Sequence, residues 1–351
     1  MENKLTQELH QLLNNGLVIP ATPTALTKTL DLDEKRQRAL LRYYQSSGAG
    51  GLAIGVHTSQ FEIREIGLYQ PILEIGKEEL DAYGAKNGKT LFRIAGVLGK
   101  TEQAVKEAGI ASDLHYHAAL VSLASFRDTS NEELIEHCKK IAEIIPIIGF
   151  YLQPSVGGRL LDADFWREFS NIQNVVAIKI APFNRYCTID VVRGVAESNR
   201  SDEVALYTGN DDNIVADLLT EFKIPVNDGI VKKRIIGGLL GHWAVWTKKA
   251  VELFDEIKHS NPLDVSELLT KGVKITDSNA AFFDSRNGFK GSIAGIHDVL
   301  IRQGLLESNH TINPNERLSP GQKKEIDRIY EIYPELNDDL FVAENLDNWL
   351  R

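Results

Sequence analysis

Eight short apolar segments recur along the chain at nearly regular intervals. They cover residues 17–20, 52–56, 91–97, 118–121, 147–151, 175–180, 204–208 and 234–239. Their starting points lie 27 to 39 residues apart, which is the length of one strand followed by one helix. Apart from single basic residues such as Lys179, the segments are continuously apolar rather than alternating, as expected for parallel strands that are buried on both faces.

The sequence between these segments has helical spacing. Ser130 and Glu133 are spaced as a capping box, and one helical face then carries Leu134, Cys138, Ile141 and Ile145. After the eighth segment, the same spacing recurs at Trp246, Ala250, Leu253 and Ile257. Both patterns predict amphipathic helices.

Eight strands alternating with helices predict an α/β fold, the (β/α)₈ or TIM barrel, over residues 1–258. Residues 259–351 are expected to form an appended C-terminal helical region. In it, a polar link at 307–317 leads to a last helix with Ser319 as N-cap, Pro320 at the first position and Gln322 closing the box. A doubly wound open sheet is the alternative, although no strand is followed by GxGxxG and no GxxxxGK[ST] occurs.

Composition narrows the classes of partner. The formal net charge is −10 and the basic clusters are short, so we expect no nucleic-acid partner. The N-terminus has no apolar core and no stretch reaches the ~18 apolar residues of a spanning helix, which predicts a soluble protein without a membrane partner. Cys138 falls on an apolar stripe and Cys187 is the other cysteine, which favours the reducing cytoplasm.

Lys179 is the first candidate for chemistry. It lies near the end of the otherwise apolar segment 175–180, at the barrel end where active sites are found. Burial there would lower its pKa from the usual ~10.4, and a neutral amine can form a Schiff base with a carbonyl substrate. The alternative is a strand-terminal lysine that pairs with a carboxylate.

Two further groups of residues follow strand ends. Tyr151 closes the preceding strand, 28 residues before Lys179, so both side chains are expected to project into the barrel mouth, where the phenol could relay protons. His57, Thr58 and Ser59 follow the second strand and could bind an anionic carboxylate. The alternatives are an interface aromatic and a turn that caps the next helix.

A metal site is not expected. The acidic pair within residues 209–212 could hold a metal, but Asn-Asp-Asp-Asn before an apolar helix is more typical of a capping turn. His57, His115 and His117 could suggest a metal-dependent lyase, yet His115 and His117 begin the fourth strand, at the wrong end of the barrel. No metal is therefore assigned.

The motifs together resemble a known family. They are TP at 22–23, GLAIG at 51–55, FYLQP at 150–154, VAIK at 176–179, TGND at 208–211 and IIGG at 235–238. On these motifs the chain, from about residue 16 to 254, resembles the dihydrodipicolinate synthase/N-acetylneuraminate lyase superfamily of class I aldolases. The resemblance implies an imine between Lys179 and pyruvate or another 2-oxo acid, proton handling by Tyr151, and carboxylate binding by Thr58 and neighbouring amides. It also implies that Gly209 and the carbonyl of Ile236 border the lysine, that no cofactor is needed, and that the protein is a homotetramer or homodimer.

The chain departs from the family pattern at three places. The family's Gly-Thr-Thr-Gly-Glu loop is Val-His-Thr-Ser-Gln at 56–60. Phe126 stands where the synthase presents a second tyrosine across the subunit interface, so it would line the pocket without a hydroxyl. Val156 stands where the synthase has an arginine for its second substrate, and Arg159 lies nearby. A site without that arginine would leave the charged second substrate unpaired, which argues against lysine-pathway synthesis.

The leading hypothesis is therefore aldol or retro-aldol chemistry on a 2-oxo acid through Lys179, with Tyr151 as proton relay. Dehydration or hydration of a sugar-derived 2-oxo acid by the same imine is the enzymatic alternative. A non-catalytic 2-oxo acid-binding barrel or scaffold is the third possibility. The sequence does not decide what the C-terminal region does.

Overall fold

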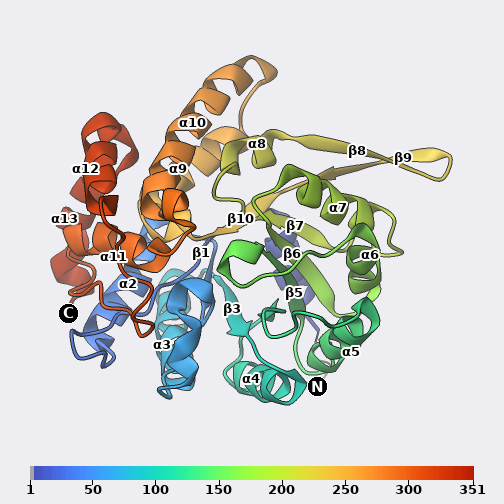
Figure 1. Ribbon diagram of the computed structural model, residues 1–351, viewed down its shortest axis with the longest axis horizontal. Helices are drawn as coiled ribbons and strands as arrows, with labels where there is room; N and C mark the ends of the chain where they lie inside the picture. Colours follow the sequence, from blue (N-terminus) through green and yellow to red (C-terminus); the bar gives the residue numbers. More distant parts are fainter. Residues whose placement is uncertain (1–3) are drawn as a thin grey trace. The chain divides into compact units, whose positions relative to one another are not determined.

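The computed structural model describes residues 4–351 (Figure 1). The chain forms two compact units. The first contains the described residues up to Leu17 together with Phe92–Leu239, and the second contains Val18–Leu91 together with Leu240–Arg351.

Eight strands form one sheet in the order β1-β10-β7-β6-β5-β4-β3-β2. Their bounds are β1 Val18–Pro20, β2 Gly51–Ile54, β3 Phe92–Val97, β4 Ala118–Ser122, β5 Ile147–Leu152, β6 Val175–Ala181, β7 Ala205–Thr208 and β10 Gly237–Leu240. The two ends of this order meet within the second unit, where Ala21 bridges Ala53 in parallel and the Thr22 N–H donates to the Ala53 carbonyl at 2.9 Å. The sheet is therefore a nearly closed (β/α)₈ barrel, which confirms the predicted fold and excludes the doubly wound open sheet.

Helices alternate with the strands of the first unit. They are α1 Gln7–Asn14, α4 Thr101–Asp113, α5 Asn131–Ala142, α6 Ala163–Asn171, α7 Arg185–Ala196 and α8 Ile214–Leu219, with the 3₁₀ turn η3 at Pro154–Val156. The capping box of Ser130 and Glu133 begins α5, as predicted, and its buried face includes Leu134, Cys138 and Ile141. Burial raises the pKa of the Cys138 thiol to about 12, so this cysteine behaves as a small hydrophobe.

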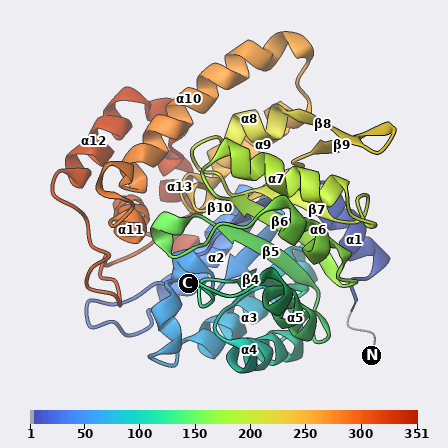
Figure 2. The same cartoon turned by 45° about the vertical axis from the view of Figure 1, so that its right-hand side comes forward.

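A β-hairpin precedes the last barrel strand and was not predicted. Strands β8 (Glu221–Val226) and β9 (Gly229–Arg234) pair antiparallel and contact α7, and the turn between them projects outward (Figures 1 and 2). Phe222 and Ile224 alternate with exposed residues along β8, which is the pattern of a strand with one buried face. The expected start of the eighth barrel strand at Arg234 is wrong, because Arg234 ends β9 and the barrel strand begins at Gly237.

The second unit holds the remaining helices. They are α2 Glu34–Ser47, α3 Tyr69–Asn87, α9 Thr247–Lys258, α10 Val265–Phe282, α11 Ser292–Arg302, α12 Gln322–Ile332 and α13 Asp339–Trp349. Short 3₁₀ turns occur at η1 His57–Ser59, η2 Phe61–Arg64, η4 His242–Ala244, η5 Pro262–Asp264, η6 Ser285–Asn287 and η7 Pro334–Leu336. The C-terminal helices bind to α2: the Arg42 guanidinium donates to the Trp349 carbonyl at 2.8 Å, and the Tyr43 hydroxyl donates to Asp338 at 2.7 Å.

The start of α12 differs from the prediction. The helix begins at Gln322 with Gly321 as its N-cap, because the Ser319 hydroxyl donates to Asp284 at 2.5 Å instead of capping the helix. Half of the expected box remains, since the Ser319 N–H donates to the Gln322 side chain at 3.1 Å. Helix α13 follows, so α12 is not the last helix. Every regular element that the structure describes after Lys258 is a helix or a 3₁₀ turn. The division of the chain at 258/259 stays a prediction.

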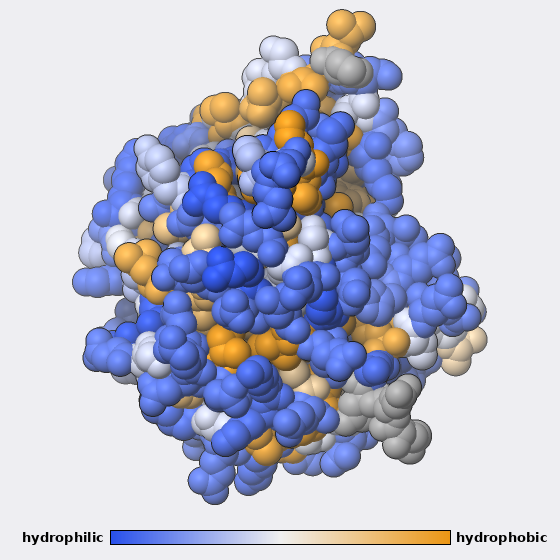
Figure 3. Space-filling view, turned by 90° about the vertical axis from the view of Figure 1, so that its right-hand side faces the viewer, coloured by the Kyte–Doolittle hydropathy of each residue, from blue (hydrophilic) through white to orange (hydrophobic). Residues whose placement is uncertain are grey.

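The surface in Figure 3 is mainly hydrophilic, and its apolar residues are scattered in small patches. Among residues 4–351, no helix has the length and apolar character needed to cross a membrane.

Candidate active site

Lys179 lies near the C-terminal end of β6 in the first unit, and only 6% of its surface is exposed. Its amine lies over the ring of Phe150, 4.4 Å from the ring centroid. Burial lowers the pKa of this amine to about 8, and the negative charge of Asp211 opposes that shift. About a tenth of the amine is therefore neutral at pH 7, far more than for an ordinary lysine, and the neutral form is the nucleophile.

Gly209 lies against the lysine side chain. A methyl group added at Gly209 would come within 2.7 Å of the Lys179 Cε and 2.9 Å of the Ala181 Cβ. The Gly209 N–H donates to the Ile180 carbonyl at 2.7 Å, which fixes the turn after β7 beside the end of β6. The structure thus brings together two of the predicted site residues, and only a residue without a side chain fits here.

A buried polar network supports this turn. The Asp217 carboxylate, fully buried on α8, accepts hydrogen bonds from Thr208 at 2.6 Å, Asn210 at 3.0 Å and Arg185 at 2.5 Å. Burial raises the pKa of Asp217, and Arg185 opposes that rise. The sequence analysis did not predict this network, because the position of Asp217 in the sequence does not distinguish it from an exposed aspartate on a helix.

Tyr151 faces away from Lys179. In the β5–β6 register Lys179 is opposite Phe150, and Tyr151 is opposite Ile180, so the two side chains project from opposite faces of the sheet. The Tyr151 ring packs on Trp166 of α6, 5.3 Å between centroids, and its hydroxyl accepts a hydrogen bond from the Leu161 N–H at 3.1 Å. The expectation that both side chains project into the barrel mouth is wrong for Tyr151, and burial raises the pKa of its phenol.

The position of Gly149 agrees with this orientation. A methyl group at Gly149, two residues before Tyr151 and on the same face of β5, would lie 3.1 Å from the Trp166 ring and 2.7 Å from Phe169. Both rings belong to α6. The face of β5 that carries Tyr151 is therefore the one covered by helix α6.

Phe126 packs on helices of the first unit. Its ring lies 4.5 Å from the ring of His137 on α5, and the Lys100 amine lies 4.1 Å above it. The Phe126 carbonyl accepts a hydrogen bond from Arg159 at 2.7 Å. These contacts engage the Phe126 ring within the first unit, and its pocket-lining position stays a prediction. Ile236 is half-buried directly before β10, and its role beside the lysine remains a prediction.

The predicted carboxylate-binding residues lie in the second unit, on η1 after β2. The Ser59 hydroxyl donates to the Thr22 carbonyl at 2.6 Å and accepts from the Gly55 N–H at 3.0 Å. A hydroxyl has one hydrogen to donate, and in this structure Ser59 uses it within the protein, so its role in carboxylate binding stays a prediction. Thr58 is buried, and the His57 ring lies 5.4 Å from that of Phe61.

The histidines considered as metal ligands have other surroundings. His117 accepts a hydrogen bond from the Arg93 N–H at 3.1 Å, and His115 has a positive φ of 59° in the turn before β4. In the part of the chain that the structure describes, no three His, Cys, Asp or Glu side chains gather as a metal site. The 209–212 turn leads into α8, but its N-cap Asn213 makes no side-chain capping bond, so the predicted capping turn is not formed.

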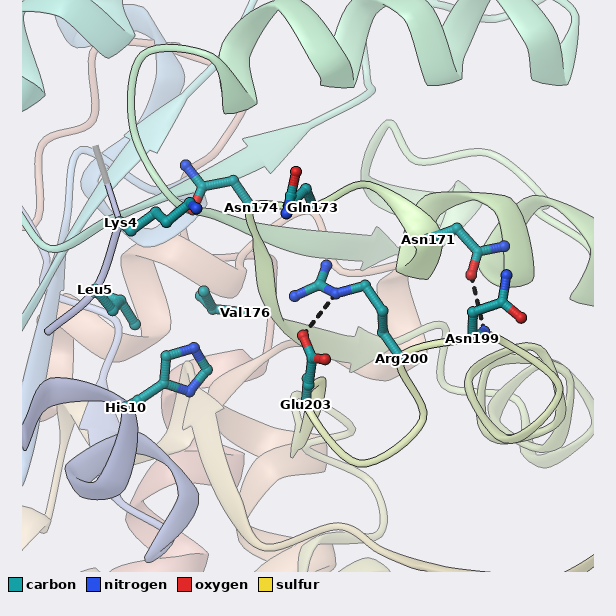
Figure 4. A pocket seen from close by; sticks show the side chains of 10 residues that line it. All are labelled: Lys4, Leu5, His10, Asn171, Gln173, Asn174, Val176, Asn199, Arg200 and Glu203. Carbon is teal, nitrogen blue, oxygen red and sulfur yellow. Dashed lines mark hydrogen bonds and ion pairs between the residues drawn. The ribbon is translucent and has the colours of Figure 1, made fainter. Parts of the chain in front are cut away.

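A cavity of about 490 Å³ lies near the start of β6 (Figure 4). It is lined by Lys4, Leu5, His10, Asn171, Gln173, Asn174, Val176, Asn199, Arg200 and Glu203. Arg200 is engaged with Glu203 at 2.8 Å and with the Val175 carbonyl at 3.1 Å. Because Lys179 lies toward the other end of the strand, this cavity is not the site of the lysine.

Residues 14–221 match the Dihydrodipicolinate synthetase family, over more than half of the chain. The chain belongs to this family. The motifs at 150–154, 176–179 and 208–211 lie inside the matched range, whereas the motif at 235–238 lies beyond it. The resemblance inferred from the sequence is thereby confirmed.

Relatives within the family are distant. The chain is 22% identical over 318 residues to N-acetylneuraminate lyase 2 of Escherichia coli O6:H1, across 90% of this chain and 92% of that protein. A structure of a monomeric dihydrodipicolinate synthase variant matches with a TM-score of 0.71 and 19% identity, across 91% of this chain and 97% of that one. YagE of Escherichia coli K12, solved in complex with pyruvate, matches with a TM-score of 0.72 and 16% identity, across 92% of this chain and 99% of YagE. These structural matches show the barrel fold.

Proposed function

We propose that this protein is a class I lyase in which Lys179 forms a Schiff base with a 2-oxo acid. The observation that supports this most strongly is the amine of Lys179, which is buried near the C-terminal end of β6 with a pKa lowered to about 8. In a barrel of this kind, that end of the strands carries the chemistry. The 2-oxo acid class is supported by membership of the family and by relatives that include an N-acetylneuraminate lyase and a protein solved in complex with pyruvate.

The reaction proposed is a retro-aldol cleavage or its reverse. The neutral amine attacks the C2 carbonyl, a carbinolamine forms, and loss of water leaves an imine between Lys179 and the substrate. A base accepts the proton of the C4 hydroxyl as the C3–C4 bond breaks, its electron pair passes into the protonated imine to give an enamine, and C4 leaves as an aldehyde. Protonation at C3 and hydrolysis of the imine release pyruvate and restore the amine.

The register of β5 and β6 favours a group other than Tyr151 for proton transfer. We infer that Asp211 serves this purpose, because it is buried and its charge acts directly on the Lys179 amine. A carboxylate beside the nitrogen can accept a proton as the amine attacks and return it when the carbinolamine loses water. Thr58, with His57, Ser59 and neighbouring amides, would bind the substrate carboxylate.

The proposal is tested by borohydride trapping with pyruvate, followed by intact mass and peptide mapping. We expect a reduced adduct on the peptide that contains Lys179 and none in Lys179→Ala. Lys233→Ala is the matched control, since burial also lowers the pKa of Lys233 but this lysine lies on the β8–β9 hairpin. Asp211→Asn should slow adduct formation by about 10²-fold or more, the range of general acid–base catalysis. Unchanged trapping in Lys179→Ala would refute the proposal.

If pyruvate gives no adduct, the same experiment with longer 2-oxo acids decides whether the site takes a larger substrate. An adduct on Lys179 with a six- to nine-carbon sugar-derived 2-oxo acid, followed by product analysis, would distinguish retro-aldol cleavage from dehydration. The aldehyde released by cleavage is absent from the products of dehydration. The expected oligomer, a homotetramer or homodimer, remains a prediction, and one structural relative is a monomeric variant.

A further inference from the structure

The polar segment Glu307–Arg317 connects α11 to α12 and contains no helix or strand. We call it the strap. It contacts two loops of the second unit that follow barrel strands. The His310 ring donates to the Lys28 carbonyl after β1 at 2.9 Å, and the Ile312 N–H donates to the Gln60 side chain after β2 at 2.7 Å. A third bond joins Asn313 to Glu62 at 3.4 Å.

The strap is internally fixed. The Thr311 hydroxyl is buried and lies within hydrogen-bond distance of the carbonyls of Asn313 at 2.8 Å and Glu316 at 3.2 Å. The Glu316 N–H also donates to the Asn313 carbonyl at 3.1 Å. These bonds close a turn next to Ile312. The backbone N–H of Ile312 is therefore presented to Gln60 by a structured segment rather than by a loose linker.

Gln60 has an unusual backbone for a residue with a side chain. Its φ is 66° and its ψ is 122°, a conformation that costs of order 1–3 kcal/mol and persists only where the surroundings hold it. The side chain is 1% exposed, and its Oε1 accepts the strap bond. Its amide nitrogen has no partner among residues 4–351, so the bond to Ile312 is the polar contact that orients the side chain.

Gln60 also ends the turn that carries the predicted carboxylate-binding residues. Its N–H donates to the His57 carbonyl at 2.9 Å. On the other side, Ser59 is tied to Thr22 and Gly55, and the Thr24 hydroxyl donates to the Ser59 carbonyl at 2.8 Å. The turn that contains Thr58 is therefore held by hydrogen bonds on two sides. One set joins it to the loop after β1, and the other joins Gln60 to the strap.

We propose that Gln60 is a positioning residue and that the strap, acting through the Ile312 N–H, holds the turn at 56–60 in the geometry that binds the substrate carboxylate. This assigns a role to the C-terminal region, and it rests on the proposed function. The ligand class is the carboxylate of a 2-oxo acid. Loss of the strap bond should weaken substrate binding more than it slows the chemical step, because the reacting atoms lie on Lys179 and not on this turn.

The test compares two ways of removing the same bond. Gln60→Met removes the acceptor at similar volume, and Ile312→Pro removes the donor. Ile312→Ala keeps the N–H, so the difference between the proline and alanine variants measures the bond itself. We expect KM for the 2-oxo acid, or the pyruvate concentration at half-maximal trapping, to rise about tenfold in Gln60→Met, with kcat or the maximal trapping rate within about threefold. The double variant should be no worse than the more affected single variant.

A second measurement does not depend on activity. Hydrogen exchange at the amides of Ser59, Gln60 and Ile63, each bonded within this turn, should accelerate in Ile312→Pro relative to Ile312→Ala. If the wild type traps no 2-oxo acid but exchange accelerates, the proposed function fails while the strap contact stands. Equal exchange in Ile312→Pro and Ile312→Ala, or an unchanged KM in a folded Gln60→Met, would overturn the inference. Asn315→Ala, an exposed strap residue, serves as the control for nonspecific loosening.

Discussion

Lys179 and Phe150 are registered neighbours on β6 and β5, and the lysine amine lies 4.4 Å from the centroid of the Phe150 ring. The aromatic residue beside the amine is thus a phenylalanine, although a tyrosine is next to it in the sequence. The Phe150 ring shields the amine from solvent but has no hydroxyl that could transfer a proton. Its π face attracts a cation only weakly compared with a carboxylate. This relationship accounts for the lowered pKa of Lys179 and leaves proton transfer to another group.

The rate of imine formation should depend on pH through Lys179. The pKa of its amine is lowered to about 8, so the trapping rate with pyruvate should rise as pH approaches 8 and level off above it. The unfolded protein holds more protons than the folded one between about pH 8 and 10.5, so the free energy of unfolding should rise with pH there. Urea unfolding of Lys179→Met should lack that rise, and a trapping rate that is flat from pH 6 to 9 would contradict the lowered pKa.

Tyr151→Phe should reduce stability rather than catalysis. The change leaves the buried Leu161 N–H without its acceptor, at a cost of about 1–3 kcal/mol, while the rate of adduct formation on Lys179 should stay within about threefold. Urea unfolding and borohydride trapping measure the two effects. Tyr44→Phe, which loses a buried bond to the Ala244 carbonyl, is the matched control. A hundredfold loss of trapping at unchanged stability would place the phenol in the site after all.

Gly209→Ala should displace the lysine. The added methyl group would lie 2.7 Å from Lys179 Cε and 3.0 Å from Cγ, closer than carbon atoms approach without a shift. We expect adduct formation to fall at least tenfold, measured by intact mass after reduction, since reacting groups tolerate little misplacement. Gly109→Ala on α4, where the new methyl group would meet nothing within 4 Å, should leave trapping unchanged and add about 1 kcal/mol of stability.

The strap should bind less firmly as pH rises toward 7. Burial, and the nearby Glu62 carboxylate, raise the pKa of Glu316 from 4.5 to about 7. The folded state therefore holds the proton more tightly, and the stability that this provides is present below about pH 4.5 and lost as pH rises through about 7. After correction for the intrinsic, base-catalysed rise of exchange with pH, the protection of amides in the turn 56–60 should fall over that window in the wild type. The same profile in Glu316→Gln would mean that another group is responsible.

The barrel was predictable because its signal is local and repeated. Each parallel strand is buried on both faces, so it appears in the sequence as a continuous apolar run at intervals of one βα unit. The capping box at Ser130 is likewise local, since both partners lie within one helical turn. Lys179 stood out for the same reason, as a cation within an apolar strand. The hairpin at 221–234 was not predicted, because its strands alternate apolar and polar residues and lie between helix α8 and the last barrel strand, outside the regular strand–helix repeat.

The sequence by itself determined the barrel, the family and the position of the buried lysine. Only the tertiary structure decided which side chains face that lysine, because a shift of one residue in strand register moves every side chain to the other face. The register between β5 and β6 changes at Ile147 and Ile148, which turns Phe150 toward Lys179 and Tyr151 toward α6. The sequence also could not predict the hydrogen bond from the Ser59 hydroxyl to Thr22 or the bond between Ile312 and Gln60. Each joins residues that are distant along the chain.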